Sequence, residues 1–111
     1  MIDLTSAADF TQPSAGEGVH WVEHLRVDAL SLGTYSIPAG GVDDQDPHTE
    51  DEIYVVTAGR ARIVTPSGSA DLAPGAVVFV PAGEEHRFVD VTEDLAVVVV
   101  FAPAEGSQAG G

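Results

Sequence analysis

Two histidines and one glutamate stand out in this chain as candidate metal ligands: His48, Glu52 and His86. His48 and Glu52 are four residues apart, so on an extended strand their side chains point to the same face. His86 follows Pro81 and Gly83, a turn that places it at the start of another strand. Two imidazoles and one carboxylate are the ligand set of non-haem iron and similar divalent centres with open positions. We therefore expect one divalent metal ion per chain, with Fe, Mn, Ni and Zn all allowed.

The composition limits both the kind of site and the kind of partner. The chain has no cysteine, so a metal must be held by histidine, carboxylate, amide or water. Its formal net charge of −14 repels phosphates, which argues against nucleic acid and anionic membranes as partners. The longest apolar run, from Leu95 to Pro103, is far shorter than the roughly 18 residues of a membrane helix. The N-terminus lacks the features of a signal peptide, so the expected location is cytoplasmic.

Short strands separated by turns are expected to position these ligands. At 111 residues the chain is large enough for one domain, and from Gly18 onward turn signals recur about every ten residues. We expect an N-terminal arm over 1–17, a barrel over 18–102 and a flexible tail over 103–111. The predicted strands cover residues 19–27, 29–37, 53–57, 60–65, 76–80, 85–91 and 95–102, with a hairpin turn at Ala58 and Gly59. No segment shows a helical stripe, so the expected fold is all-β, a small antiparallel jelly-roll β-barrel.

The spacing of the candidate ligands resembles the two motifs of the cupin superfamily. The first motif is matched by Gly40, His48, Glu52 and Gly59, and the second by Gly75, Pro81, Gly83 and His86. The resemblance covers residues 18–102 and implies a small single-domain cupin with a metal in its barrel. Resemblance to small cupins also implies a homodimer, formed through sheet faces or exchanged N-terminal strands.

The sequence departs from the family pattern at two positions. Asp46 replaces the first histidine of the first motif, and Asp90 replaces the final asparagine of the second. Asp46 could still bind a metal through oxygen, but Pro47 restricts it to extended conformations. The neighbouring Gln45 or a water molecule could take the fourth position instead.

Further side chains are candidates for the pocket or for catalysis. By strand parity with His48, Glu50 and Tyr54 point inward and could serve in catalysis, although a solvated Glu50 is the favoured alternative. His20 and His24 are too far apart for one metal and are expected on the surface or at an interface, with Trp21 in the core or a subunit contact. Phe88, which shares parity with His86, is the best of several aromatic candidates for the pocket wall, which are Tyr35, Tyr54, Phe79, Phe88 and Phe101.

Several functions remain compatible with this site. The cupin resemblance implies dioxygenation, isomerisation or lyase chemistry, and the fold does not choose among them. A dioxygenase is favoured among enzymes, because two histidines and a carboxylate leave positions for both substrate and dioxygen. The main alternative is a non-catalytic module that binds or senses a small molecule or a metal. A purely structural barrel is disfavoured, because unpaired buried polar groups cost stability.

Overall fold

The structure, a computed structural model, describes residues 1, 4, 20–43 and 48–107 of the chain. The described residues form an all-β, jelly-roll-like fold without helices. Its six strands are β1 (His20–Val27), β2 (Leu30–Ile37), β3 (Asp51–Thr65), β4 (Gly68–Leu72), β5 (Val77–Val80) and β6 (Arg87–Ala102). The expected fold class is confirmed.

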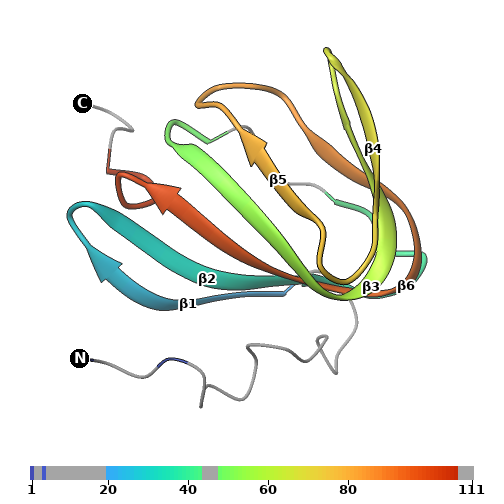
Figure 1. Ribbon diagram of the computed structural model, residues 1–111, viewed down its shortest axis with the longest axis horizontal. Helices are drawn as coiled ribbons and strands as arrows, with labels where there is room; N and C mark the ends of the chain where they lie inside the picture. Colours follow the sequence, from blue (N-terminus) through green and yellow to red (C-terminus); the bar gives the residue numbers. More distant parts are fainter. Residues whose placement is uncertain (2–3, 5–19, 44–47, 108–111) are drawn as a thin grey trace.

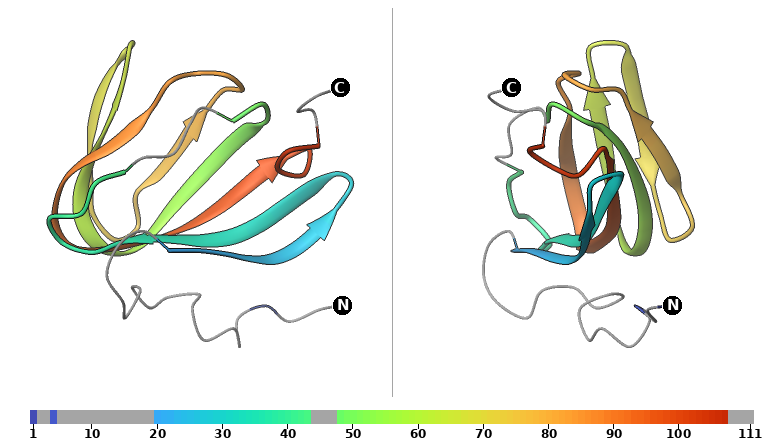
Figure 2. Two further views of the ribbon diagram at one scale, coloured as in Figure 1. Left: turned by 180° about the vertical axis from the view of Figure 1, so that it is seen from behind. Right: turned by 90° about the vertical axis from the view of Figure 1, so that its left-hand side faces the viewer.

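The two longest strands form the centre of one antiparallel sheet. The order is β1-β2-β6-β3-β4, and β5 pairs with β3 beside β4. β3 therefore has β6 along one edge, while its other edge is shared by β5 near its start and β4 near its end. Figures 1 and 2 show the resulting curvature, in which β4 stands steeply relative to the β1–β2 hairpin. This curvature gives the sheet an inner face on which distant strands meet.

The predicted hairpin at Ala58 and Gly59 is wrong, because β3 continues through both residues. Gly59 has a positive φ of 89°, and a Cβ at this position would overlap the carbonyl oxygen of Asp94 on β6. The pairing with β6 shifts register on either side of Ala58. The glycine thus allows an irregular, bent strand with close backbone contact, and the turn-like composition of this segment marks a bulge.

Two other strand boundaries differ from expectation. Residues 92–94 were expected to separate two strands, but β6 runs without a break through them. β4 was not predicted, because its sequence GSADL carries little β propensity. It forms by pairing with the end of β3 across a turn at Pro66 and Ser67. In both cases the partner strand decides the local conformation.

The inner face of the sheet carries the core. Along β3 the side chains of Glu52, Tyr54 and Val56 are buried, while Asp51 and Ile53, which precede Glu52 and Tyr54, are exposed. This is the period-two alternation of a sheet with one covered face. The apolar side chains packed on this face include Tyr35, Ile37, Tyr54, Ile63, Leu72, Phe88, Leu95, Val97, Val99 and Phe101.

The segment after β6 lies against the barrel at residues 103–107, which differs from the expectation of a flexible tail. Ala104 is 3% exposed, and the backbone N–H of Glu105 donates to Ser31 Oγ at 2.8 Å. Residues 108–111, and most of the expected arm at 1–17, lie outside the described residues. Within the part that is described, no helix is long and apolar enough to cross a membrane.

Candidate functional site

The site residues come from three separate segments of the chain. Glu52 and Tyr54 lie two apart on the inner face of β3, and His86 lies immediately before β6. His48 lies just before β3. Along the β3–β6 ladder Glu52 pairs with Phe101, whereas Arg87, next to His86, pairs with Val64 toward the other end of β3. The side chains of Glu52 and His86, 34 residues apart in sequence, therefore meet across the inside of the curved sheet and not along the ladder.

Glu52, Tyr54 and His86 form one buried hydrogen-bonded group, called the triad below. The Tyr54 hydroxyl lies 2.6 Å from Glu52 Oε2 and 2.8 Å from His86 Nε2. His86 Nε2 is also 3.5 Å from Glu52 Oε1, and both side chains are only 1% exposed. The predicted pair of ligands, Glu52 and His86, is therefore brought together by the fold.

The hydrogen bonds of the triad orient its three side chains. His86 Nδ1 lies 3.0 Å from the carbonyl oxygen of Glu84, so Nδ1 carries a proton and donates it. The Tyr54 hydroxyl donates its proton to Glu52 Oε2. The Tyr54 oxygen also lies within hydrogen-bond distance of His86 Nε2, the ring nitrogen that faces the site.

The environment of Glu52 favours its protonated form. Burial raises the pKa of the Glu52 carboxyl above its ordinary value of 4.5. The hydrogen bond from Tyr54 and the nearby charges of His86 and His48 act in the opposite direction but do not cancel this effect. A cation bound beside Glu52 would supply the missing counter-charge and replace the proton.

The donor chemistry of the site fits a divalent ion, although the third ligand stands apart. The bond from His86 Nδ1 to Glu84 directs Nε2 inward, an orientation that metal-binding histidines commonly have. The rings of His48 and His86 have centroids 6.2 Å apart. Among residues 20–43 and 48–107, no three His, Cys, Asp or Glu side chains are gathered closely enough to hold a metal as they stand. Asp46 and Gln45 lie outside the described residues.

A cavity of about 140 Å³ adjoins the triad. His48 forms part of its wall and connects it to the site, with its ring 4.7 Å from that of Phe101. Glu105 Oε2 lies 3.7 Å from His48 Nδ1. The cavity is lined by Trp21, Tyr35, His48, Tyr54, Val99, Phe101 and Glu105.

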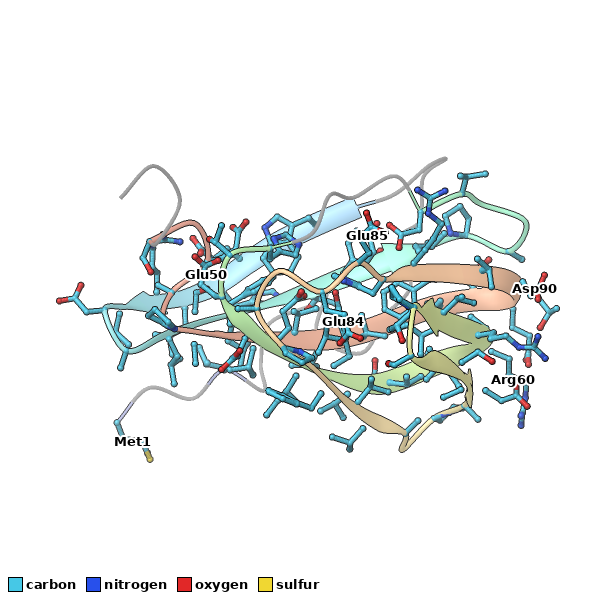
Figure 3. All side chains as sticks on the ribbon, turned by 90° about the horizontal axis from the view of Figure 1, so that it is seen from above. Met1, Glu50, Arg60, Glu84, Glu85 and Asp90 are labelled. Atoms are coloured by element: carbon cyan, nitrogen blue, oxygen red, sulfur yellow. The ribbon has the colours of Figure 1, made fainter. Side chains whose placement is uncertain are left out.

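For Glu50 the structure contradicts the solvated alternative, and a catalytic role stays a prediction. Its side chain is buried rather than solvated, but its carboxylate accepts hydrogen bonds from Gly106 N at 2.9 Å and from the Thr49 hydroxyl. Figure 3 shows Glu50 near one end of the molecule, opposite the end where Arg60 and Asp90 lie. Glu50 therefore anchors the segment after β6.

The aromatic candidates divide between wall, core and surface. Tyr35, Tyr54 and Phe101 line the cavity as expected, and so does Trp21. Phe88 is buried against the rings of Tyr35 and Tyr54 and belongs to the core, so its selection as the best wall residue is wrong. Phe79 is 60% exposed on the outer face and is not a wall residue.

The remaining histidines and the second departure from the motif lie away from the triad. His24 Nε2 pairs with Thr34 Oγ1 at 2.8 Å, and the side chain of His20 is outside the described part. Asp90 is exposed and has a positive φ of 52°, a conformation that Asp and Asn tolerate better than most residues. The substitution of asparagine by aspartate is therefore compatible with the backbone.

Sequence reasoning missed two acidic residues. Asp43 is 1% exposed and accepts hydrogen bonds from the Tyr35 hydroxyl at 2.8 Å and from Phe88 N at 2.9 Å. Glu105 reaches the cavity from a segment that was expected to be flexible. Neither Asp43 nor Glu105 belongs to a sequence motif, so their contacts become visible only in the folded structure.

Comparison with known proteins gives a consistent picture. A family model described as the cupin domain matches residues 33–102. An uncharacterised protein of Streptomyces coelicolor, SCO3923, is 44% identical over 92 residues, which cover 83% of this chain and 87% of that protein. Among solved structures, KdgF from a Halomonas species has a TM-score of 0.70 at 21% identity, covering 81% of this chain and 84% of KdgF. TT1209 from Thermus thermophilus has a TM-score of 0.72 at 22% identity, covering 86% and 91%. At these identities the solved structures support the fold alone.

Proposed function

Because this chain belongs to the cupin domain family, we propose that it binds one divalent metal ion together with a small organic molecule. His48, Glu52 and His86 would hold the metal, and the molecule would occupy the adjoining cavity. Such an ion polarises oxygen atoms of a bound ligand and acts as a Lewis acid. The protein contributes a dry, shaped cavity and side chains that fix the orientation of the ligand.

The observation that carries this proposal is the pairing of His86 Nε2 with Glu52 Oε1 at 3.5 Å inside the barrel. A carboxylate buried to 1% exposure is costly unless a cation or a proton accompanies it. A barrel built only for stability would be better served by apolar side chains at these positions. A metal ion would compensate the charge of Glu52 and use the inward lone pair of His86.

Tyr54 is the residue that would join the metal site to the cavity. Its ring lines the cavity, and its hydroxyl contacts Glu52 and His86, two of the three proposed ligands. We assign it the role of holding a proton at the border between the two, where a bound molecule can receive it. Glu50, which is directed toward Gly106, is assigned a positioning role.

Metal content of protein purified without a histidine tag tests the proposal. We expect about one divalent ion per chain in the wild type and a large loss in both His86→Ala and Glu52→Gln. His24→Ala is the matched control, since His24 pairs with Thr34 on β2. Equal metal content in the wild type and both site variants would contradict the assignment. Asp46→Asn completes the series and is expected to lower affinity by less than about tenfold, as for a position that water or Gln45 can fill.

Oxygen chemistry is the second candidate function, favoured by the ligand set. Two histidines and one carboxylate leave open positions of the kind used by non-haem iron oxygenases. Dioxygen consumption by the iron-loaded protein, measured against a panel of small molecules, tests it. Binding of a molecule without dioxygen uptake or product would identify a binding module.

We also propose that the protein is a homodimer. Ile53, Val77 and Phe79 expose 41%, 65% and 60% of their surface, and Ile53 lies directly opposite Phe79 across β3 and β5. Val55 lies opposite Val77 on the same face. A contiguous apolar patch on a sheet face is typical of a protein contact, and a second copy would cover it.

A further inference from the structure

The described residues that line the cavity beside the triad include four large aromatic side chains and one acidic group. The rings are those of Trp21, Tyr35, Tyr54 and Phe101, which we call the aromatic cage. Trp21 and Phe101 meet edge to face, with centroids 5.9 Å apart and planes at 76°. Glu105 is the acidic group, and among the described residues no lysine or arginine lines the cavity.

The hydroxyl groups of the two cage tyrosines are committed elsewhere. The Tyr35 hydroxyl donates to Asp43 at 2.8 Å, and the Tyr54 hydroxyl contacts Glu52 and His86. Both tyrosines therefore present ring carbon to the cavity. A ligand that needs several hydrogen bonds would lose those it makes to water and gain few in return.

Glu105 is held at the cavity by bonds to its backbone. The N–H of Glu105 donates to Ser31 Oγ at 2.8 Å, and the carbonyl oxygen of Glu105 accepts from Arg26. The N–H of the next residue, Gly106, donates to Glu50 Oε1 at 2.9 Å. Ser31 and Glu50 are 0% and 1% exposed. Buried side chains thus fix the turn, while the Glu105 carboxylate remains 34% exposed.

We propose that the aromatic cage binds a fully methylated ammonium group, with Glu105 as its counter-charge. This names the ligand class of the small-molecule site in the proposed function and rests on it. A methylated ammonium has no N–H to satisfy, and the faces of aromatic rings attract it. A primary ammonium has three N–H groups to satisfy, whereas the ring faces of the cage suit methyl groups. The net charge of −14 also attracts cations to the molecule.

Two features of the cavity limit the size and the charge of the ligand. At about 140 Å³ it is smaller than the roughly 300–1,000 Å³ of sites for drug-sized ligands, so it accepts one small group. The Glu105 carboxylate supplies one negative charge at the cavity, which matches a ligand group with a single positive charge.

Binding of choline and of its neutral isostere 3,3-dimethylbutan-1-ol tests the proposal. Trp21 is the only tryptophan of the chain, so its fluorescence reports occupancy of the cage directly. We expect choline to bind about tenfold more tightly than the neutral alcohol, the preference of a partly desolvated cation–aromatic site. Equal binding, tighter binding of the alcohol, or no binding of choline would overturn the inference.

Two substitutions assign the preference to named residues. Glu105→Gln should lower the preference for choline by about threefold or more and leave the affinity for the alcohol unchanged. Glu93→Gln, which removes the same charge at an exposed residue paired with Arg60, should change neither affinity. Trp21→Leu, followed by calorimetry, should weaken choline by about tenfold. An unchanged preference in Glu105→Gln overturns the role of the carboxylate.

The titrations are made with metal-loaded and with chelator-treated protein, and metal content is measured separately. If the protein takes up no metal when metal is added but still prefers choline, the metal site is refuted and the cage is supported. One equivalent of metal without any preference for choline would refute the cage and leave the metal site standing.

Discussion

The Tyr54 hydroxyl lies 2.8 Å from His86 Nε2, the ring nitrogen with which that imidazole would bind a metal. The other ring nitrogen of His86 donates to Glu84. A metal on His86 Nε2 and the contact between Nε2 and the Tyr54 hydroxyl are therefore mutually exclusive. The same hydroxyl donates to Glu52 at 2.6 Å, so one group stabilises the metal-free form of Glu52 and His86, two of the three proposed ligands.

Tyr54→Phe is expected to raise metal affinity by about fivefold to tenfold, because it removes the competing hydrogen bond. The metal-free variant should also lose about 1–2 kcal/mol of unfolding free energy, since buried Glu52 and His86 lose a partner. Calorimetric titration with one metal measures the first effect and urea denaturation the second. Tyr35→Phe is the matched control, because its hydroxyl bonds to Asp43 instead. Weaker metal binding by Tyr54→Phe would show that the phenol oxygen is itself a ligand.

The raised pKa of Glu52 predicts how the stability of the metal-free protein depends on pH. Burial makes the folded state prefer the protonated carboxyl, so this contribution is fully present below the unfolded pKa of 4.5. It is lost as the pH rises through the raised folded pKa. Unfolding free energies measured with chelator from about pH 4 to about pH 8 should fall over this window.

Glu52→Gln isolates the contribution of this carboxyl. The amide cannot ionise, so the stability difference between wild type and variant should change in favour of the variant as the pH rises. The control Glu93→Gln removes an exposed carboxyl that pairs with Arg60. A pH dependence identical in the wild type and Glu52→Gln would contradict the assignment of the effect to Glu52.

Asp43 is expected to be important for stability although it belongs to no motif. Asp43→Ala leaves the Tyr35 hydroxyl and the Phe88 N–H without their buried acceptor and should cost about 2–4 kcal/mol. Asp43→Asn can accept from Phe88 and donate to Tyr35, so a smaller loss of about 1 kcal/mol is expected. Urea denaturation of the three proteins gives the comparison. A loss in Asp43→Ala within about 0.5 kcal/mol of zero would refute the structural role.

The fold class could be predicted from sequence because turn signals recur along the chain, and the pairing of Glu52 with His86 because each stands in one of the two motifs that resemble those of cupins. Alternation along β3 places Glu52 and Tyr54 on one face. Strand continuity could not be predicted, because Gly59 reads as a turn unless the close approach of Asp94 on β6 is known. The register of long-range pairing, which decides this, is not encoded in local composition.

The residues that line the cavity show the same limit to prediction from sequence. Trp21 and Glu105 come from opposite ends of the barrel sequence and meet only because β1 and the segment after β6 lie beside the same strand, β2. Phe88 was assigned to the wall by parity with His86, which gives the face of a strand but not its distance from the cavity. Phe79 points to the outer face, since it lies opposite the exposed Ile53.

The exposed face of β3 and β5 predicts the oligomeric state. The double variant Val77→Ser with Phe79→Ser should shift the protein from dimer to monomer, because it removes most of the apolar area of this patch. Light scattering at tens of micromolar protein measures the mass. Val64→Ser is the control, since Val64 is 39% exposed near the β4 end of β3. If the double variant is still a dimer, the subunit contact lies elsewhere. If the wild type is a monomer, the proposed homodimer is refuted.

Gly33→Ala should disturb the cavity without touching the proposed metal ligands. A Cβ at Gly33 would overlap the ring of Trp21 and approach the carbonyl of Val22, so the indole must move from its place against β2. Because Trp21 is one wall of the cavity, we expect its fluorescence spectrum to shift and choline affinity to fall about tenfold. Metal affinity should stay within about twofold of the wild type, since the triad lies on β3 and before β6. Ala58→Gly is a control that changes one methyl group elsewhere on the sheet. Unchanged choline binding in Gly33→Ala would show that the position of Trp21 does not determine the ligand site.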